Sequence, residues 1–216
     1  MPKTPARVHV IIARQSRYAI ILRRGPSKSV CTIGWNLKNN QFEMGQWIRG
    51  RIYERRCDLS PDGRYFIYFA MNGKWSSKAK GSWSAISKAP YLKAIGLWAN
   101  GSCWNGGGLF IDNRTYWLNS PSFGEESQLV PGSLKPFSEF PHTESYGREC
   151  PGVYYIRLQR EGWKLLRHAS DGYTVFEKSL SKGWVLEKTC HATIDHPPGK
   201  GCYYDTHRLI HIERGL

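Results

Sequence analysis

The sequence has few acidic residues, and their distribution is uneven. Among its 216 residues, 17 are aspartate or glutamate and 31 are lysine or arginine, which gives a formal net charge of +14. Residues 1–108 contain 18 of the basic residues but only four of the acidic ones, so this half accounts for the whole excess. We therefore expect an anionic partner such as nucleic acid, a phosphorylated ligand or an acidic protein surface. A basic face that only maintains solubility is the alternative.

Several other features are missing, and each absence argues against a class of protein. No run approaches the roughly 18 apolar residues of a membrane span, so we expect no membrane partner. Residues 1–10 contain neither the apolar stretch of a signal peptide nor a lipidation motif, which predicts a cytoplasmic protein. GxSxG and HExxH motifs are absent. The glycines at 106–108 lead into a strand-like run, whereas a P-loop needs a helix there, so we interpret them as a close backbone approach and expect no cofactor.

Cysteine spacing argues against the common metal motifs. The six cysteines are at least 12 residues apart, so the sequence contains no CxxC pair. One late set, Cys190, His191, His196 and Cys202, has metal-ligating residue types, but its spacing matches no zinc pattern. We therefore predict no metal site, and we interpret most cysteines as small core residues.

Short β-branched and aromatic runs alternate with turn signals along the chain, which predicts an all-β fold. A pattern of two strands around a tight polar turn recurs in residues 8–24, 55–70, 108–119, 153–169 and 202–213. The residues that precede the second strand of each copy are Arg17, Arg64, Arg114, Trp163 and Arg208, at intervals of 45 to 50 residues. A period of this length, with room for four short strands, is typical of propeller blades.

We therefore predict one β-propeller-like domain over residues 1–216, and a β-sandwich is the alternative fold. Its repeats are expected at about 7–50, 51–106, 107–150, 151–194 and 195–216. Residues 30–36 and 41–47 are expected to supply the outer strands of the first repeat. Residues 174–180 and 183–189 are expected to do the same in the fourth.

The second copy contains a recognisable hairpin motif. Residues 59–68, Leu-Ser-Pro-Asp-Gly-Arg-Tyr-Phe-Ile-Tyr, resemble the S-P-D-G-[KR]-x-[IL] hairpin of WD40-like repeats in the TolB-type propeller family. Proline sets φ for such a turn, aspartate accepts backbone hydrogen bonds and glycine adopts a positive φ. The resemblance covers about ten residues and implies a propeller hairpin, but it implies no particular function.

Basic and aromatic residues alternate in residues 63–111, a segment of 49 residues that contains no acidic residue. Within it, residues 72–88 are expected to form a long polar loop, and Trp98 is expected in the core. Cations beside aromatic rings can hold phosphate while bases stack on the rings. The predicted nucleic-acid-binding residues here are Lys74, Trp75, Lys78, Lys80, Trp83, Lys88 and Trp104.

Two arginine clusters extend the predicted basic surface. Strand alternation would place Arg49, Arg51 and Arg55 on one face and Arg56 on the other, so we add the first three to the candidate site. Residues 23, 24 and 28 form a further cluster. The alternative is that these are ordinary exposed basic residues of separate strands.

These features predict a non-catalytic binding module, a subunit of a larger complex, whose basic, tryptophan-bearing half engages nucleic acid. A scaffold subunit that docks an acidic protein is the first alternative. A five-bladed glycoside hydrolase is the second, with Asp58, Asp112 and Asp205 as carboxylates from separate repeats around the axis. Against the hydrolase, all three occupy turn positions where aspartate commonly accepts backbone hydrogen bonds.

Overall fold

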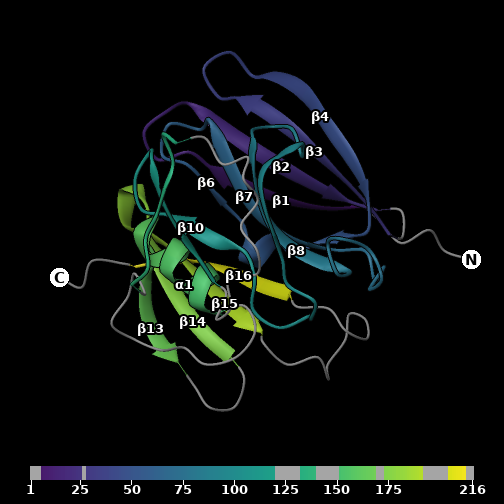
Figure 1. Cartoon of the computed structure of the whole chain (residues 1–216). Coiled ribbons are helices and arrows are strands. Elements are labelled where there is room, and N and C mark those ends of the chain that lie inside the picture. The colour runs from purple at the N-terminus through teal and green to yellow at the C-terminus, as the bar shows by residue number, and fades with distance from the viewer. Residues whose placement is uncertain are drawn as a thin grey trace, which may run out of the picture. The chain divides into compact units, whose positions relative to one another are not determined.

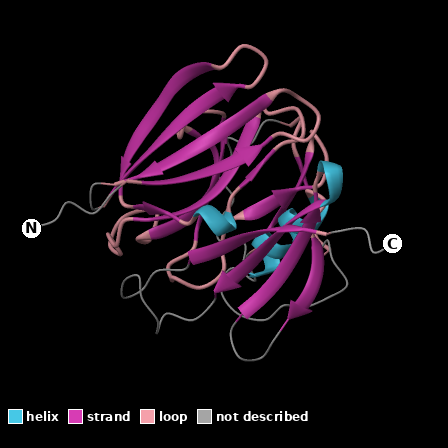
Figure 2. Cartoon of the chain, turned by 180° about the vertical axis from the view of Figure 1, so that it is seen from behind, coloured by secondary structure: helices cyan, strands magenta, loops and turns pink. Residues whose placement is uncertain are grey.

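The computed structural model describes residues 6–25, 28–119, 132–139, 151–168, 173–191 and 204–212. The chain divides into two compact units, Met1–Arg157 and Leu158–Leu216, each of which is considered by itself. Strands make up most of the described residues, and they form four sheets (Figures 1 and 2). The predicted all-β class is therefore confirmed. Among the described residues, no helix is long and apolar enough to cross a bilayer.

The first sheet is an antiparallel meander in chain order (Figure 1). Its strands are β1 (Arg7–Ile12), β2 (Tyr18–Arg24), β3 (Ser29–Asn36) and β4 (Gln41–Arg49). One face carries Ile11, Ile20, Leu22 and Val30 into the core, where they pack with residues of the second sheet. The predicted first hairpin and both outer strands of the first repeat are confirmed.

The second sheet contains two largely buried seven-residue strands. Its elements are β5 (Arg51–Ile52), the 3₁₀ turn η1 (Glu54–Arg56), β6 (Asp58–Leu59), β7 (Tyr65–Met71), β8 (Ser82–Lys88) and β9 (Ala94–Ala99). Strands β5 and β6 pair with the same side of β7, and β8 and β9 follow on the other side. Because β8 lies between two strands and both its faces are covered, residues 82–87 are all buried.

The hairpin between β6 and β7 forms as its sequence predicts. The Ser60 hydroxyl donates to Asp62 Oδ1 at 2.7 Å and accepts the Tyr65 N–H at 2.9 Å. Gly63, with φ +79°, donates its N–H to the Ser60 carbonyl at 2.8 Å. The side chains of Ser60 and Asp62 and the positive φ of Gly63 thus account for the tight turn.

The third sheet completes the first unit. Strands β10 (Gly108–Phe110) and β11 (Thr115–Leu118) form the predicted third hairpin, and β12 (Lys135–Pro136) pairs in parallel with β11. Phe110 and Tyr116 pack with Ile67, Ile86 and Trp98 in a second core cluster. Trp98 is only 3% exposed, so its predicted core position is confirmed.

The fourth predicted hairpin is wrong in its first half. Residues 153–158 lie in helix α1 (Pro151–Arg160) instead of in a strand. Proline is favoured in the first turn of a helix. At the other end Gly162 adopts φ +86°, and the N–H groups of Gly162 and Trp163 donate to the carbonyls of Gln159 and Leu158 at 3.0 Å each, which is a Schellman cap. The Glu161–Gly162 turn therefore ends a helix rather than closing a hairpin.

The second unit contains one antiparallel sheet in chain order. Its elements are β13 (Lys164–His168), β14 (Tyr173–Ser179), the 3₁₀ turn η2 (Ser181–Gly183), β15 (Trp184–His191) and β16 (Tyr204–His211). The predicted strands at 174–180 and 183–189 are confirmed as β14 and β15. The predicted fifth hairpin is wrong, since residues 204–211 form one strand that pairs continuously with β15. Its supposed turn, Thr206–Arg208, contains neither glycine nor proline to break an extended chain.

Candidate anion-binding site

A basic pocket opens in the first unit where three connections lie side by side. It has a volume of about 880 Å³ and is bordered by the β2–β3 turn, the β4–β5 turn and the segment after β7. Among the described residues, five basic and no acidic residues line it, and these are Arg24, Lys28, Arg49, Arg51 and Lys74. We call this set the basic pocket. It brings together three of the predicted binding residues, at 49, 51 and 74, and two members of the 23–28 cluster.

Backbone hydrogen bonds hold the three connections together. The Gly50 N–H donates to the Lys28 carbonyl at 2.9 Å, and Arg51 pairs with Met71 across β5 and β7. Gly50 has φ +144°, and a Cβ there would lie 2.6 Å from the Met71 carbonyl oxygen, so a side chain does not fit. On the third connection, the N–H of Asn72 donates to the Gly81 carbonyl at 3.0 Å. The cations therefore project from a fixed backbone frame.

Arg51 is partly buried, as is Arg24, and it is held against an aromatic ring. Its guanidinium lies over the Tyr53 ring, 4.3 Å from the centroid, which orients it by a cation–π contact. Its Nε is shielded from solvent and has no hydrogen-bond partner among the described residues. A shielded donor without an acceptor is unfavourable. Lys28, Arg49 and Lys74 are exposed and can move toward an anionic ligand.

The predicted tryptophans separate into two groups. Trp75 and Trp104 are 53% and 58% exposed, as a stacking role requires. Trp75 directly follows Lys74 of the basic pocket and lies against Gly81, where any side chain would clash with its ring. Trp83, by contrast, is 8% exposed and belongs to the core, because it lies on the central strand β8. It is therefore not a surface residue. The predicted loop over 72–88 was too long, because β8 begins at Ser82 and the loop covers only residues 72–81.

The arginines after β5 do not follow strand alternation, because residues 54–56 form the 3₁₀ turn η1. Arg55 is 8% exposed, and its guanidinium lies 5.1 Å from the centroid of the Tyr154 ring. Arg56 is fully buried against the rings of Tyr53 and Phe69 and donates to the carbonyls of residues 103 and 105. The predicted one-face arrangement is wrong, and Arg55 takes part in packing rather than in the basic pocket.

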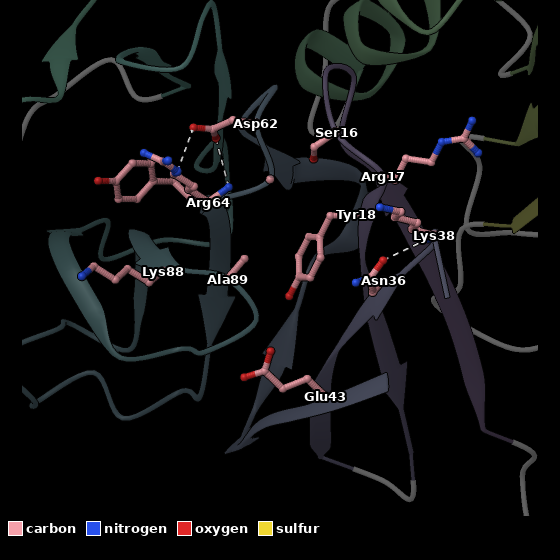
Figure 3. A pocket seen from close by; sticks show the side chains of 12 residues that line it. Ser16, Arg17, Tyr18, Asn36, Lys38, Glu43, Asp62, Arg64, Lys88 and Ala89 are labelled. Atoms are coloured by element: carbon pink, nitrogen blue, oxygen red, sulfur yellow. Dashed lines mark hydrogen bonds and ion pairs between the residues drawn. The ribbon is translucent and has the colours of Figure 1, made fainter. Parts of the chain in front are cut away.

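The other predicted lysines lie outside the basic pocket. Lys78 and Lys80 are exposed on the β7–β8 connection, and Lys88 is exposed at the end of β8. Lys88 lines a second pocket of about 690 Å³ in the first unit, which Figure 3 shows. The other charged residues of that pocket are Arg17, Lys38, Arg64, Glu43 and Asp62.

The second pocket has mixed charge, and its carboxylates already have partners. Glu43 accepts the Tyr91 hydroxyl at 2.6 Å, and Asp62 lies 3.5 Å from Arg64. Figure 3 shows Tyr18 pointing toward Glu43. Burial raises the pKa of Tyr18 to about 12, and the negative charge of Glu43 adds to the shift. This pocket therefore contains neutralising carboxylates, whereas the charged residues described in the lining of the basic pocket are all cations.

The three aspartates of the hydrolase alternative each make structural interactions. Asp58 is fully buried, and its Oδ2 accepts the Phe110 N–H at 2.8 Å. Asp112 Oδ1 accepts the N–H groups of residues 114 and 115 at 2.7 Å each, and these bonds lower the pKa of the Asp112 carboxyl. In the second unit, Asp205 lies 3.2 Å from the Lys188 ammonium. These contacts match the turn and pairing roles that aspartate often has.

The candidate metal ligands are only partly described. Cys190 is buried on β15, and His191 Nε2 lies 3.3 Å from the Thr206 hydroxyl. His196 and Cys202 fall outside the described residues. Within the part of the chain that the structure describes, no group of three or more histidine, cysteine, aspartate or glutamate side chains could hold a metal ion.

The sequence reasoning missed Trp47. It is 55% exposed on β4, and the Arg23 guanidinium lies 5.7 Å from the centroid of its ring. Its position in an alternating strand next to the 49–51 arginines was the available signal.

No family model matches the chain, and no curated protein matches it. Among solved structures, the chain is similar to the 1.18 Å crystal structure of the uncharacterized protein lmo1340 from Listeria monocytogenes EGD-e, at 10% sequence identity and a TM-score of 0.38. The similarity covers 92% of this chain and 65% of that protein, so the chain spans just under two thirds of its length. A likeness this weak carries no conclusion about fold or function.

Proposed function

We propose that the chain binds nucleic acid through the basic pocket. The observation that carries this proposal is the convergence of five basic side chains from three connections on a pocket whose described lining contains no carboxylate. Phosphate groups are the anions that several clustered lysines and arginines bind together. Arg51 adds a shielded donor that needs an acceptor, and the arginine fork suits phosphate oxygens.

The surroundings of the pocket favour a strand with unpaired bases. Trp75 is exposed and adjoins Lys74, so a phosphate held by the lysine would place a neighbouring base within reach of the indole ring. Base stacking on exposed aromatic rings beside a cationic groove is the usual way in which proteins bind single strands without reading their sequence. Trp104 offers a further exposed ring in the same unit.

We further propose that the sheets are successive blades of a β-propeller, to which the WD40-like hairpin at residues 59–68 would belong. Two observations support this architecture. The first and fourth sheets are four-stranded antiparallel meanders in chain order, and the second has the same order from β6 to β9. The connections between blades are where propellers carry binding residues, and the basic pocket lies at such a connection.

The test compares two double variants with the same loss of charge. Arg49→Gln with Lys74→Gln removes two exposed cations of the basic pocket, whereas Arg114→Gln with Lys38→Gln removes two exposed cations elsewhere in the first unit. We expect binding of a fluorescent single-stranded oligonucleotide, followed by anisotropy at low salt, to weaken markedly only in the first variant. Equal weakening in both would show that the total charge, and not the pocket, determines binding. Retained binding in both would refute the site.

Trp75→Ala separates nucleic acid from an acidic protein as the anionic partner. Loss of the ring should weaken single-stranded oligonucleotide binding by about 1–3 kcal/mol, the usual value for one stacked base. Binding of a heparin-like polyanion, which has no bases, should not change. If both ligands lose affinity equally, the tryptophan acts only on the loop conformation and the proposed stacking is wrong.

A further inference from the structure

The first sheet exposes an apolar face that the basic pocket does not use. Strand register places Val10, Ile21, Ile33 and Met44 in one row across all four strands, because directly paired residues share a face. A second row on the same face runs from Ile12 through residues 19 and 35 to Phe42. We call this surface the outer face; its large apolar members are Val8, Val10, Ile12, Ile21, Ile33, Trp35, Phe42, Met44 and Trp47.

The outer face is exposed over both edge strands. Val8 and Ile12 on β1 are 62% and 53% exposed, and Phe42, Met44 and Trp47 on β4 are 61%, 59% and 55% exposed. The opposite face of the same sheet is buried in the core. An antiparallel sheet with one solvated face normally alternates apolar and polar residues, whereas here both faces are apolar. A contiguous apolar patch of this kind marks an interaction surface.

The charges around the outer face select the kind of partner. No acidic residue lies on this face in the register of the four strands, and Arg23 and Arg49 lie on it at the end that carries Trp47. A second copy would bring its own arginines and its net charge of +14 against them, and such like charges oppose association. A protein segment with apolar side chains and carboxylates complements both features.

We propose that the outer face docks an acidic amphipathic segment, in helical form, of another protein. The apolar face of such a helix would cover the rows through Met44 and Phe42, and its carboxylates would pair with Arg23 and Arg49. Helices that bind grooves and sheets in this way use apolar residues at i, i+3, i+4 and i+7. The apolar rows lie outside the basic pocket, and Arg49 is a residue that the two surfaces share, so the apolar contacts do not depend on nucleic-acid binding.

The test uses two labelled helical peptides with the same leucines at i, i+3, i+4 and i+7 and with either glutamate or lysine at the other positions. We expect the glutamate peptide to bind the full chain, and Met44→Glu to weaken that binding by about ten-fold or more. Met44 is 59% exposed, so this variant should keep the parent's melting temperature. Ser76→Glu, which adds the same single negative charge on the exposed β7–β8 connection, should leave peptide binding unchanged.

Three results would overturn the proposal. The first is that the glutamate peptide fails to bind, or binds no better than the lysine peptide, which would show that charge complementarity plays no part. The mass of the parent in solution rises with concentration and Met44→Glu restores the monomer, which makes a second copy the occupant. Anionic phospholipid vesicles bind the parent through Met44 while the glutamate peptide does not, which makes a lipid surface the occupant.

Discussion

The salt dependence of oligonucleotide binding follows from the number of cations in the basic pocket. For single strands, the logarithm of the association constant falls with the logarithm of salt concentration by about 0.7 for each phosphate that a cation neutralises. If each of the five pocket cations contacts one phosphate, the slope is about −3.5. Raising the salt from about 50 to 200 mM should then lower the affinity by about 130-fold.

The double variant Arg49→Gln with Lys74→Gln leaves three cations in the pocket. Its slope should become shallower, at about −2.1. The same change of salt should then lower its affinity by only about 20-fold. Fluorescence anisotropy of a labelled short oligonucleotide, titrated at several salt concentrations, measures both slopes. The control variant Arg114→Gln with Lys38→Gln should keep the slope of the parent.

Two outcomes would refute this reasoning. If the pocket variant keeps the parental slope, its two cations do not contact phosphate, and the binding site lies elsewhere. If the control variant lowers the slope as much as the pocket variant, the oligonucleotide follows the general positive potential of the first unit. A steeper slope in either variant cannot be explained by counterion release, because the variants have fewer cations. It would show that the mode of binding has changed.

Three further predictions concern stability. In chemical denaturation, Trp83→Ala should lower the free energy of unfolding by about 3–5 kcal/mol. Trp75→Ala, at an exposed position, should lower it by less than about 1 kcal/mol. Gly107→Ala should cost at least about 1–3 kcal/mol, since φ is +76° there and a Cβ would collide with the Arg56 carbonyl; an unchanged melting temperature would contradict this. Because the folded pKa of Asp112 is lowered, its contribution is present at neutral pH and lost on acidification, so the stability gap to Asp112→Asn should narrow below about pH 4.

Two of the hairpins that the sequence predicted correctly have turns with residues that determine backbone conformation. Residues 60–63 form the β6–β7 turn with a serine, an aspartate and a glycine in their usual roles. Between β10 and β11, Asp112 fixes the turn, because its carboxylate accepts hydrogen bonds from two backbone N–H groups. Local hydrogen bonds and a positive φ are encoded within a few residues, so a pattern search finds them.

Residues 153–158 show where the same approach fails. All six are buried, and all but Arg157 are aliphatic or aromatic; such a short run is compatible with a strand covered on both faces or with a buried helix. The signals that distinguish the two lie at the ends, at Pro151 and Gly162, and not in the run itself. The repeat period favoured a strand because Trp163 fell at the expected interval. A long-range pattern thus overrode local capping signals that were correct.

The candidate site was predictable in its chemistry but not in its membership. Composition identified an acid-free segment and its cations, yet the chain places Arg55 and Trp83 in the interior and brings Arg24 and Lys28 to Arg51. Which basic residues meet depends on pairings such as Ser29 with Arg49 and Arg51 with Met71, which join strands far apart in the sequence.

Alternation within one strand cannot supply that information, because a single 3₁₀ turn at residues 54–56 is enough to turn a basic side chain inward. The long aliphatic stem and planar head of arginine make this inward position tolerable: Arg56 lies against two aromatic rings and donates to two carbonyls. A lysine would present a single ammonium to the same rings and carbonyls. Arginines in a basic stretch therefore have to be separated into packing and binding residues by the structure, and here Arg55 and Arg56 pack while Arg49 and Arg51 face the pocket.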